Sequence, residues 1–464
     1  MTEPHWLGVR DLADAYASRR LSPVEMVQAL LQRIERLDPG LNAFIRLDPA
    51  DILAQAREAE RAILAGCSLG PLHGVPVGLK DMIDVAGVPT TCHSKVMLDH
   101  VARSDAAVVG KLRQAGAILF GKLACHEFGW GGHSWDLPFP LARNPWNRDH
   151  HPGGSSSGCA AAVAAGFLPL ALGTDSGGSV RNPASSCGLV GVKPTYGLVS
   201  RRGAFPLAYT LDHIGPLARS VEDATLLLDA IAGHDAQDPG SAPGPARGAA
   251  ADLRRGIAGL RVGFVRHFHE QDMVADPEMA AALEHVADVL RREGATVAEC
   301  RLPPLAEFFG VNRTLLLAEG WAVHAPWLRE RPEDYGRIMR TRAMAGAFVS
   351  GGDYVQAQRR RLELIAAVDD VFRDVDVLLL ASAMDPPCRI DDPAEEARTY
   401  ARQARLPFNV TGHPAAVAMC GLTQNGLPLS AQFVGRAFDD AMVLRTAAAY
   451  ERATDWHMRH PPLH

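Results

Sequence analysis

Two clusters of glycine and serine carry residue types that could do chemistry together. The first spans residues 151–163, where three serines stand between glycines directly ahead of an alanine-rich apolar segment, and the second spans residues 173–181. A hydroxyl buried without a partner costs about 1–3 kcal/mol, so serines set in apolar sequence indicate that the hydroxyls are used. Glycines let backbone N–H groups approach a bound group closely. The two clusters therefore predict a serine nucleophile beside backbone donors that stabilise an anion.

A lysine within a short apolar strand offers a base for such a nucleophile. Residues 75–81 are predicted to form this strand, which carries Lys80. A serine hydroxyl is a weak nucleophile until a neighbouring base removes its proton. Lysine can be that base only when it is neutral, and burial lowers its pKa toward working pH. Asp81 could oppose this effect, but in a strand its side chain is expected to point to the other face.

The elements that must position these groups alternate between helices and short apolar strands. A capping box at Ser22 predicts a helix that ends near residue 38. Further helices are expected at residues 51–65, 106–115 and 278–292, and strands at residues 75–81, 117–122, 260–265, 377–380 and 429–434. Residues 234–258 are predicted to be a linker, and residues 300–372 to be mostly helical. This alternation favours an α/β fold around a central sheet.

The composition is that of an ordinary globular protein. The chain has 464 residues, of which 47% are hydrophobic and 22% charged, with a net charge of -6 and no stripe of basic residues. We therefore expect no nucleic-acid or membrane surface. The eight cysteines include no C-x-x-C pair, and the N-terminus shows no signal peptide, so reduced thiols and a cytoplasmic location are expected. Residues 159–173, the longest apolar run, are too short to span a bilayer and are expected to be a buried core element.

Three motifs in combination resemble the amidase signature family. They are residues 78–81 (GLKD), 152–156 (PGGSS) and 173–181 (GTDSGGSVR), supported by matches at residues 143–146, 191–197, 212–216, 408–414 and 426–428. The resemblance runs from about residue 5 to 455 and is weakest between 240 and 350. It implies a single domain over residues 1–464, with a central mixed twisted sheet flanked by many helices. Within it, residues from about 240 to 350 would form a variable, mostly helical region that shapes the substrate pocket.

The resemblance also implies roles for individual residues. Ser179 would be the nucleophile, Ser155 the bridging serine after a cis Gly154–Ser155 peptide, and Lys80 the base. The oxyanion hole would be formed by backbone N–H groups of Ser176, Gly177, Gly178 and Ser179. The loop would be supported by Thr174, Asp175 and Arg181, and the acyl pocket would be walled by Phe128, Gly129, Trp130 and Gly131. Ser157 and Cys159 depart from the family pattern, and we expect them to alter packing without loss of activity.

The implied activity is hydrolysis of the C–N bond of a small neutral carboxylic amide through a serine acyl-enzyme. Aryl amides, carbamates and related acyl compounds are variants within the same machinery. No cofactor is expected, the partner is a small-molecule substrate, and the resemblance implies a homodimer. An alternative is the glutamine-hydrolysing A subunit of a tRNA-dependent amidotransferase, which releases ammonia from glutamine. An acidic residue that would hold glutamine's amino group falls near Arg402, and residues 401–405 contain no carboxylate, which favours a stand-alone hydrolase.

Two other patterns predict different chemistry. Residues 154–158 match the G-x-S-x-G elbow of α/β-hydrolases, but that motif needs an apolar strand immediately upstream, and residues 144–152 have the composition of a loop. The histidines at His126, His150–His151, His267 and His269 lack the i, i+4 spacing of a helical zinc motif. We therefore predict no metal site.

Overall fold

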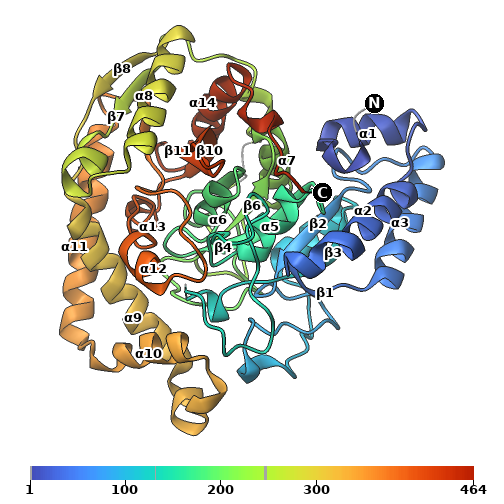
Figure 1. Ribbon diagram of the computed structural model, residues 1–464, viewed down its shortest axis with the longest axis horizontal. Helices are drawn as coiled ribbons and strands as arrows, with labels where there is room; N and C mark the ends of the chain where they lie inside the picture. Colours follow the sequence, from blue (N-terminus) through green and yellow to red (C-terminus); the bar gives the residue numbers. More distant parts are fainter. Residues whose placement is uncertain (1–2, 131, 245–247, 464) are drawn as a thin grey trace.

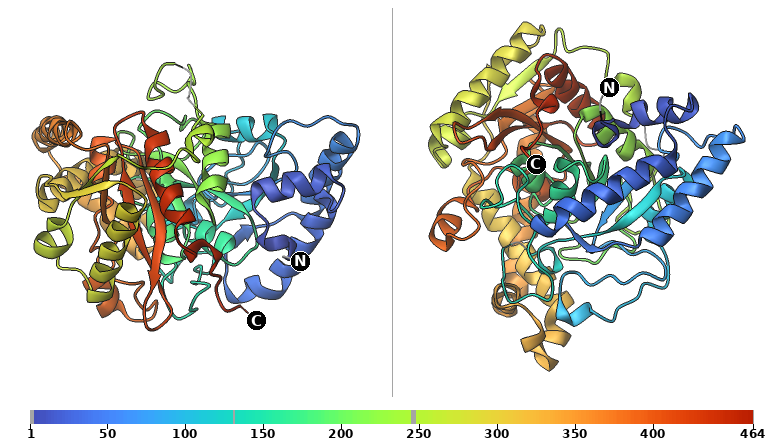
Figure 2. Two further views of the ribbon diagram at one scale, coloured as in Figure 1. Left: turned by 90° about the horizontal axis from the view of Figure 1, so that it is seen from above. Right: turned by 45° about the vertical axis from the view of Figure 1, so that its right-hand side comes forward.

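A single mixed sheet runs through the centre of the molecule (Figures 1 and 2). The computed structural model describes residues 3–130, 132–244 and 248–463, and within them the sheet has 11 strands in the order β1-β3-β2-β4-β6-β5-β10-β11-β9-β7-β8. The strands are β1 (Phe44–Arg46), β2 (Pro76–Lys80), β3 (Ile118–Leu123), β4 (Leu170–Asp175), β5 (Val190–Lys193), β6 (His213–Ala218), β7 (Arg261–Phe264), β8 (Thr296–Glu299), β9 (Val377–Ala381), β10 (Ala415–Leu422) and β11 (Pro428–Val434). Because β2 runs parallel to β3 and β4 while β4 is antiparallel to β6, the expected mixed sheet is confirmed.

Helices flank this sheet along its whole length. They are α1 (Val9–Ala17), α2 (Pro23–Leu37), α3 (Pro49–Leu64), α4 (Ala107–Gln114), α5 (Ser157–Ala164), α6 (Arg181–Ser186), α7 (Val221–Ile231), α8 (Pro277–Arg292), α9 (Leu305–Glu330), α10 (Arg337–Ala345), α11 (Gly351–Val371), α12 (Pro393–Thr399), α13 (Pro407–Thr411) and α14 (Asp440–Arg452). Figure 1 shows α1–α3 beside the first strands and α9–α11 at the opposite end of the molecule. Within the described residues, no helix combines the length and the apolar character that a membrane crossing needs.

Local sequence signals explain the first helices. The Ser22 hydroxyl accepts a hydrogen bond from the Glu25 N–H at 3.1 Å, and the Glu25 carboxylate accepts one from the Ser22 N–H at 2.8 Å. This reciprocal capping starts α2, whose apolar face is buried in the core. The chain ends lie on the same side of the molecule in Figure 1, and Trp6 stacks on His460 with ring centroids 3.8 Å apart.

The parallel pair β2 and β4 sets the position of the candidate catalytic groups. Leu79 of β2 pairs with Leu172 of β4, so the carboxyl ends of both strands meet at the same edge of the sheet. Lys80 ends β2 and Asp175 ends β4. Residues 159–173, expected as one core element, are instead most of α5 followed by the first part of β4. Both are buried, and the chain turns between them at Gly166, which has a φ of +69°.

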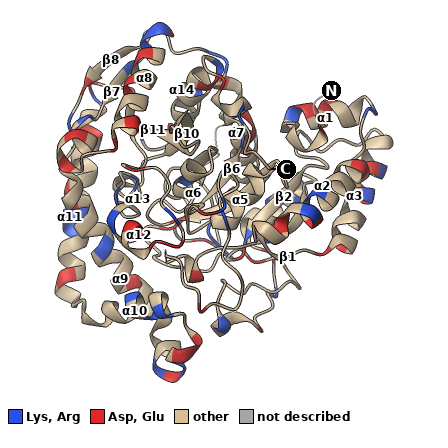
Figure 3. Ribbon diagram, viewed as in Figure 1, with Lys and Arg blue, Asp and Glu red and all other residues tan. Residues whose placement is uncertain are grey.

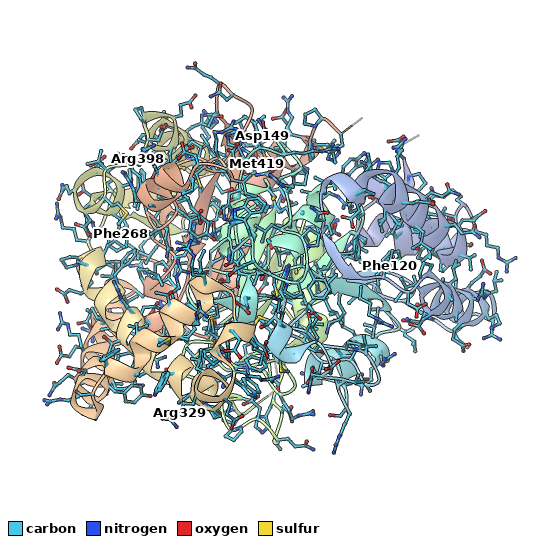
Figure 4. All side chains as sticks on the ribbon, turned by 60° about the horizontal axis from the view of Figure 1, so that its bottom comes forward. Phe120, Asp149, Phe268, Arg329, Arg398 and Met419 are labelled. Carbon is cyan, nitrogen blue, oxygen red and sulfur yellow. The ribbon has the colours of Figure 1, made fainter. Side chains whose placement is uncertain are left out.

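The region of weakest resemblance extends the sheet and covers one side of it. Residues 240–350 contain β7, α8, β8, α9 and α10, and β7 pairs with β9 to add two strands at the sheet edge. Figure 4 labels Phe120 and Phe268 in opposite halves of the molecule, and both side chains are fully buried in one continuous apolar core. Figure 3 shows charged residues mainly on the outer helices and the central strands largely free of them.

Candidate active site

Lys80 lies at the centre of the site, at the end of β2. Its Nζ donates hydrogen bonds to Ser155 Oγ at 2.7 Å and to Thr174 Oγ1 at 2.6 Å. The side chain is fully buried, and this burial lowers the pKa of Lys80, while Cys125, Cys159 and more distant carboxylates oppose the shift. A lysine in this setting is more easily neutral, as a general base must be.

Asp81 is directed away from the base, as its place in a strand predicts. Its carboxylate forms a buried ion pair with Lys122 at 3.0 Å and accepts a hydrogen bond from the Thr91 N–H at 2.9 Å. The negative charge next to Lys80 in sequence is therefore neutralised on the other side of the strand.

The first glycine–serine cluster places Ser155 against Lys80. The Gly154–Ser155 peptide is cis, as the resemblance implies. The Ser155 carbonyl accepts a hydrogen bond from the His126 N–H at 3.0 Å, and the Ser156 N–H donates to the Ser179 carbonyl at 3.2 Å. A side chain at Gly154 would overlap the His126 ring, which explains the glycine there. The Ser156–Ser179 contact joins the two serine clusters that lie apart in sequence.

Asp175 organises the second cluster. Its carboxylate accepts hydrogen bonds from the Gly178 N–H at 2.7 Å, the Val180 N–H at 3.2 Å and the Arg181 guanidinium at 3.0 Å. Burial alone would raise the pKa of Asp175, but Arg181 and Asn409 outweigh it and hold this pKa well below its usual range. The loop carrying Ser179 is thus folded around one ionised carboxylate.

Arg181 links this loop to the C-terminal part of the chain, through α13, the segment before it and β11. The fully buried guanidinium donates to Gln432 Oε1 at 2.7 Å, Asn409 Oδ1 at 2.6 Å and the Arg405 carbonyl at 2.9 Å. Thr174, which the resemblance groups with Asp175 and Arg181, contacts Lys80 instead.

The candidate oxyanion donors differ in whether their N–H groups already form hydrogen bonds within the protein. The Gly178 N–H is already donated to Asp175, which leaves Ser176, Gly177 and Ser179 as donors for a developing anion. The Ser176 carbonyl accepts a hydrogen bond from Asn312 Nδ2 at 3.2 Å, and the Ser176 hydroxyl donates to Asp212. Burial raises the pKa of Asp212 to about 6, and the hydrogen bond from Ser176 opposes the shift.

Ser179 opens onto a cavity of about 760 Å³. The lining residues are Gly129, Trp130, Gly154, Ser176, Gly177, Gly178, Ser179, Asn182, Leu207, Phe309, Gly310, Asn312, Arg313, Leu316, Leu317, Thr341, Arg342, Ala345, Tyr400, Ala401, Gln403, Arg405 and Leu406. Gly129 and Trp130 are thus on the wall where the resemblance places them. Phe128 is not, because it is buried among Phe205, His324, Trp327 and Tyr335. Gly131 lies outside the described residues.

Part of the cavity wall carried no signal in the sequence. Helices α9 and α10 supply Asn312, Arg313, Leu316, Thr341 and Arg342. These helices belong to the region of weakest resemblance, and helical periodicity shows which face is apolar without showing which segment that face will meet. Only their packing against the rest of the fold brings them over Ser179.

Three buried histidines meet behind Ser155. One ring nitrogen from each of His126, His133 and His151 lies within 4.8 Å of the others. The Gly132 N–H donates to His126 Nδ1 at 2.8 Å, and the Gly153 N–H donates to His151 Nδ1 at 2.9 Å. A neutral imidazole that accepts at Nδ1 carries its proton on Nε2. In two of the three rings, Nε2 therefore carries a proton and has no lone pair with which to bind a cation. The absence of a metal site stays a prediction.

Burial sets the protonation of these rings. It lowers the pKa of His133 to about 3 and lowers the pKa values of His126 and His151 well below their usual range, with the neighbouring imidazoles as smaller causes for the latter two. The cluster is thus neutral at working pH. Its contribution to the site is steric and directional, since His126 and His151 hold residues 153–155 in place.

The alternative nucleophile elbow does not fit the described fold. No strand is found in the described residues between the end of β3 at Leu123 and the start of α5 at Ser157. Ser157 is the first residue of α5, and its Oγ lies 3.5 Å from the Ala124 carbonyl. Cys159 is fully buried in the same helix, and burial raises the pKa of its thiol to about 12. Both departures from the family pattern are packing positions.

Comparisons with known proteins agree with this geometry. The family model described as Amidase matches residues 25–444. The chain is 40% identical to the A subunit of glutamyl-tRNA(Gln) amidotransferase from Chloroflexus aggregans, over 100% of this chain and 99% of the relative. The X-ray structure of peptide amidase from Stenotrophomonas maltophilia matches with a TM-score of 0.85 and 31% identity, over 98% of each chain. A bacterial aryl acylamidase matches with a TM-score of 0.88 and 26% identity, again over 98% of each chain. The chain therefore belongs to the amidase signature family of hydrolases.

Proposed function

We propose that this protein hydrolyses the C–N bond of a carboxylic amide through an acyl-enzyme formed on Ser179. The observation that carries the proposal is the 2.7 Å contact between Lys80 Nζ and Ser155 Oγ in a fully buried setting. Once Lys80 is neutral, the same contact lets Nζ accept the Ser155 proton while Ser155 takes the proton of Ser179. The Ser179 oxygen then attacks the substrate carbonyl.

The remaining steps use the same groups in reverse order. The negative charge on the carbonyl oxygen is met by backbone N–H groups of the loop, for which Ser176, Gly177 and Ser179 remain available. The proton held on Lys80 returns through Ser155 to the leaving amine as the C–N bond breaks. Water then attacks the ester, giving its proton to the same relay, and the acid leaves with Ser179 restored. Over the whole cycle the enzyme has no net gain or loss of protons.

Glutamine is the amide of the second candidate function. By sequence similarity this candidate is better supported than a stand-alone hydrolase, because the A subunit of a glutamyl-tRNA(Gln) amidotransferase matches at 40% identity along the whole chain. In that function the chain would act with partner subunits and release ammonia. The charges of the side chains that line the cavity favour a stand-alone hydrolase instead, and this argument uses the residues of this chain itself.

Glutamine carries an ammonium group that needs a carboxylate partner. None of the described residues that line the cavity is Asp or Glu, whereas three are arginines. Arg402, near which an acidic residue is expected for glutamine, does not line this cavity; its guanidinium pairs with Asp385 at 3.0 Å in a separate pocket. An ammonium in the cavity would therefore be desolvated without a partner, which costs several kcal/mol.

Ammonia release from the purified chain decides between the two candidates. The substrates are an aryl amide, an aliphatic amide and a carbamate, each with an unsubstituted NH2 group so that hydrolysis releases ammonia, together with glutamine. All are measured with the chain alone. We expect turnover of at least one simple amide and little turnover of glutamine. A variant Ala401→Asp, which places a carboxylate on the cavity wall, should improve the relative rate with glutamine, and Arg398→Asp on the exposed side of α12 serves as the matched control. The second candidate would be established instead if glutamine were the only one of these substrates to be turned over, and only after partner subunits were added.

A further inference from the structure

Ser176 of the oxyanion loop lies between two cavities. It lines the cavity of about 760 Å³ above Ser179 and also a second cavity of about 280 Å³, whose walls include Leu207 and Asp212. A residue beside a void has no packing partners on that side. With a cavity on each side, packing contributes little to the position of Ser176, and its hydrogen bonds decide which way its backbone points.

The buried carboxylate of Asp212 is the partner of the Ser176 hydroxyl. Ser176 Oγ donates to this carboxylate, which also accepts hydrogen bonds from the Leu207 N–H at 2.9 Å and the Ala208 N–H at 3.1 Å. Burial raises the pKa of Asp212 to about 6, so at neutral pH the group is ionised and offers only acceptor oxygens. Hydrogen bonds to an ionised acceptor are shorter and stronger than those between neutral groups, and the hydroxyl is held firmly.

The peptide planes on either side of Ser176 carry two of the candidate oxyanion donors. The Ser176 N–H points opposite to the Asp175 carbonyl in one plane, and the Gly177 N–H points opposite to the Ser176 carbonyl in the next. The Asp175 carbonyl accepts a hydrogen bond from Asn409 Nδ2 at 3.0 Å, and the Ser176 carbonyl accepts one from Asn312 Nδ2 at 3.2 Å. The Ser176 Cα joins the two planes, so the anchor on its side chain sets the angle between them.

We propose that Asp212 is a positioning residue, which aims the N–H groups of Ser176 and Gly177 at the carbonyl oxygen of the substrate by holding the Ser176 hydroxyl. The inference rests on the proposed amide hydrolysis and adds a residue to it. Asp212 lines the second cavity and not the one above Ser179, so it acts through Ser176. Donors that are fixed in advance stabilise the developing charge without reorganisation during the reaction.

Helix α9 holds the loop that carries Asp212. The Glu319 carboxylate accepts hydrogen bonds from the Thr210 N–H at 2.9 Å and from the Thr210 hydroxyl at 2.6 Å. Asn312 lies about two helical turns earlier in α9, and positions at this spacing share one side of a helix. The helix thus reaches Ser176 twice, directly at its carbonyl and through the Asp212 loop at its hydroxyl. These two contacts fix the residue from different directions.

Substitutions at either end of the anchor test the proposal. Asp212→Asn replaces one acceptor oxygen by an NH2 group, and Ser176→Ala removes the hydroxyl. Each should lower kcat by about tenfold or more with KM changed by less than about twofold, because a misdirected donor is missed chiefly in the transition state. Ser176→Thr keeps a hydroxyl and should keep most of kcat. Ammonia release is measured at about pH 8, where Asp212 is ionised, with whichever compound above the wild type turns over fastest.

A double-mutant cycle separates positioning from a general effect on the fold. If Asp212 acts through the Ser176 hydroxyl, Asp212→Asn should lower the kcat of the Ser176→Ala variant by less than about threefold. The matched control is Asp229→Asn on α7, where the carboxylate also accepts two successive N–H groups, from Ala249 at 2.8 Å and Ala250 at 3.0 Å. Its kcat should equal that of the wild type. Full multiplication of the two losses in the double variant would overturn the proposal.

Further outcomes decide the assignment. Wild-type kcat in Asp212→Asn, or a loss confined to KM, would also contradict it. Should urea unfolding show that Asp212→Asn does not fold, the two Ser176 variants remain, and equal kcat values for Ser176→Ala and Ser176→Thr would rule out an anchor at the hydroxyl. Failure of the proposed function is distinct from these results, since the wild type would then turn over no amide and a fluorophosphonate probe would not label Ser179.

Discussion

Lys80 Nζ and Ser155 Oγ lie 2.7 Å apart although 75 residues separate them in the chain. The contact exists because β2 ends at Lys80 next to β4, while the segment before α5 carries Ser155 to the same edge of the sheet. Thr174 at the end of β4 closes the other side of the amine at 2.6 Å. The lysine thus has two hydroxyl partners and no ion-pair partner among the described residues, an arrangement that favours its neutral form.

Replacement of the base should remove activity together with its pH dependence. Because burial lowers the pKa of Lys80, its neutral fraction rises with pH through a pKa below the ordinary lysine value. We expect kcat/KM of the wild type to rise toward alkaline pH and then level off. Lys80→Met should lower kcat by roughly 10²–10⁴-fold or more, and its residual rate should lack this rise. Rate measurements from pH 5 to about 10 check both points, and an acid optimum would contradict a lysine base.

The nucleophile assignment can be tested by covalent labelling. Ser179→Ala should abolish turnover and labelling by a fluorophosphonate probe, because the variant lacks the hydroxyl that the relay of Ser155 and Lys80 would activate. Ser157→Ala is the matched control, since Ser157 is buried at the start of α5 and its hydroxyl bonds to the Ala124 carbonyl. Intact-mass measurement reports the labelled fraction of each variant. Full labelling of Ser179→Ala would assign the nucleophile to another residue.

Asn312 should support the oxyanion loop from α9. Its Nδ2 donates to the Ser176 carbonyl at 3.2 Å, so Asn312→Ala removes a hydrogen bond that fixes the direction of the following N–H groups. A net hydrogen bond is worth about 0.5–1.5 kcal/mol, which corresponds to a fall of roughly two- to tenfold in kcat. Thr314→Ala on the same helix is the control, because the Thr314 hydroxyl bonds within its own helix. A change in KM with kcat unaffected would show that Asn312 contacts substrate only.

The role of Asn312 also shows where the sequence stops being informative. Lys80, Ser155 and Asp175 lie in short motifs with special residue types, and the strands that carry Lys80 and Asp175 end at one edge of the sheet. The capped helix α2 could be predicted from residues in contact along the chain. In each case the signal is local, or it depends on parallel strands whose ends coincide.

The positions that sequence reasoning missed or misplaced depend on packing between distant segments. Helix α9 has no motif, and its cavity-facing side is fixed by contacts with α10, α11 and α13. Phe128 lies next to Gly129 in sequence but is turned away from the cavity by a backbone with a φ of +49°. The three histidines are separate in the chain and become one cluster only when residues 126–133 fold against residues 151–155. Contacts between segments far apart in the chain produce no periodic pattern in the sequence from which they could be predicted.

The buried pair of Asp175 and Arg181 should account for a large part of the loop's stability. Asp175→Asn leaves the fully buried Arg181 guanidinium without its counter-charge, which costs about 3–5 kcal/mol of the free energy of unfolding. Asp288→Asn, which removes an exposed pair with Arg291 on α8, should change it by less than about 1 kcal/mol. Urea unfolding at neutral pH measures both. The folded-state pKa of Asp175 lies below its unfolded value, so its contribution is fully present above the unfolded pKa of about 3.9 and is lost as pH falls through the folded pKa. The difference between wild type and Asp175→Asn should therefore shrink in acid, and a difference that stays constant down to low pH would contradict an ionised Asp175.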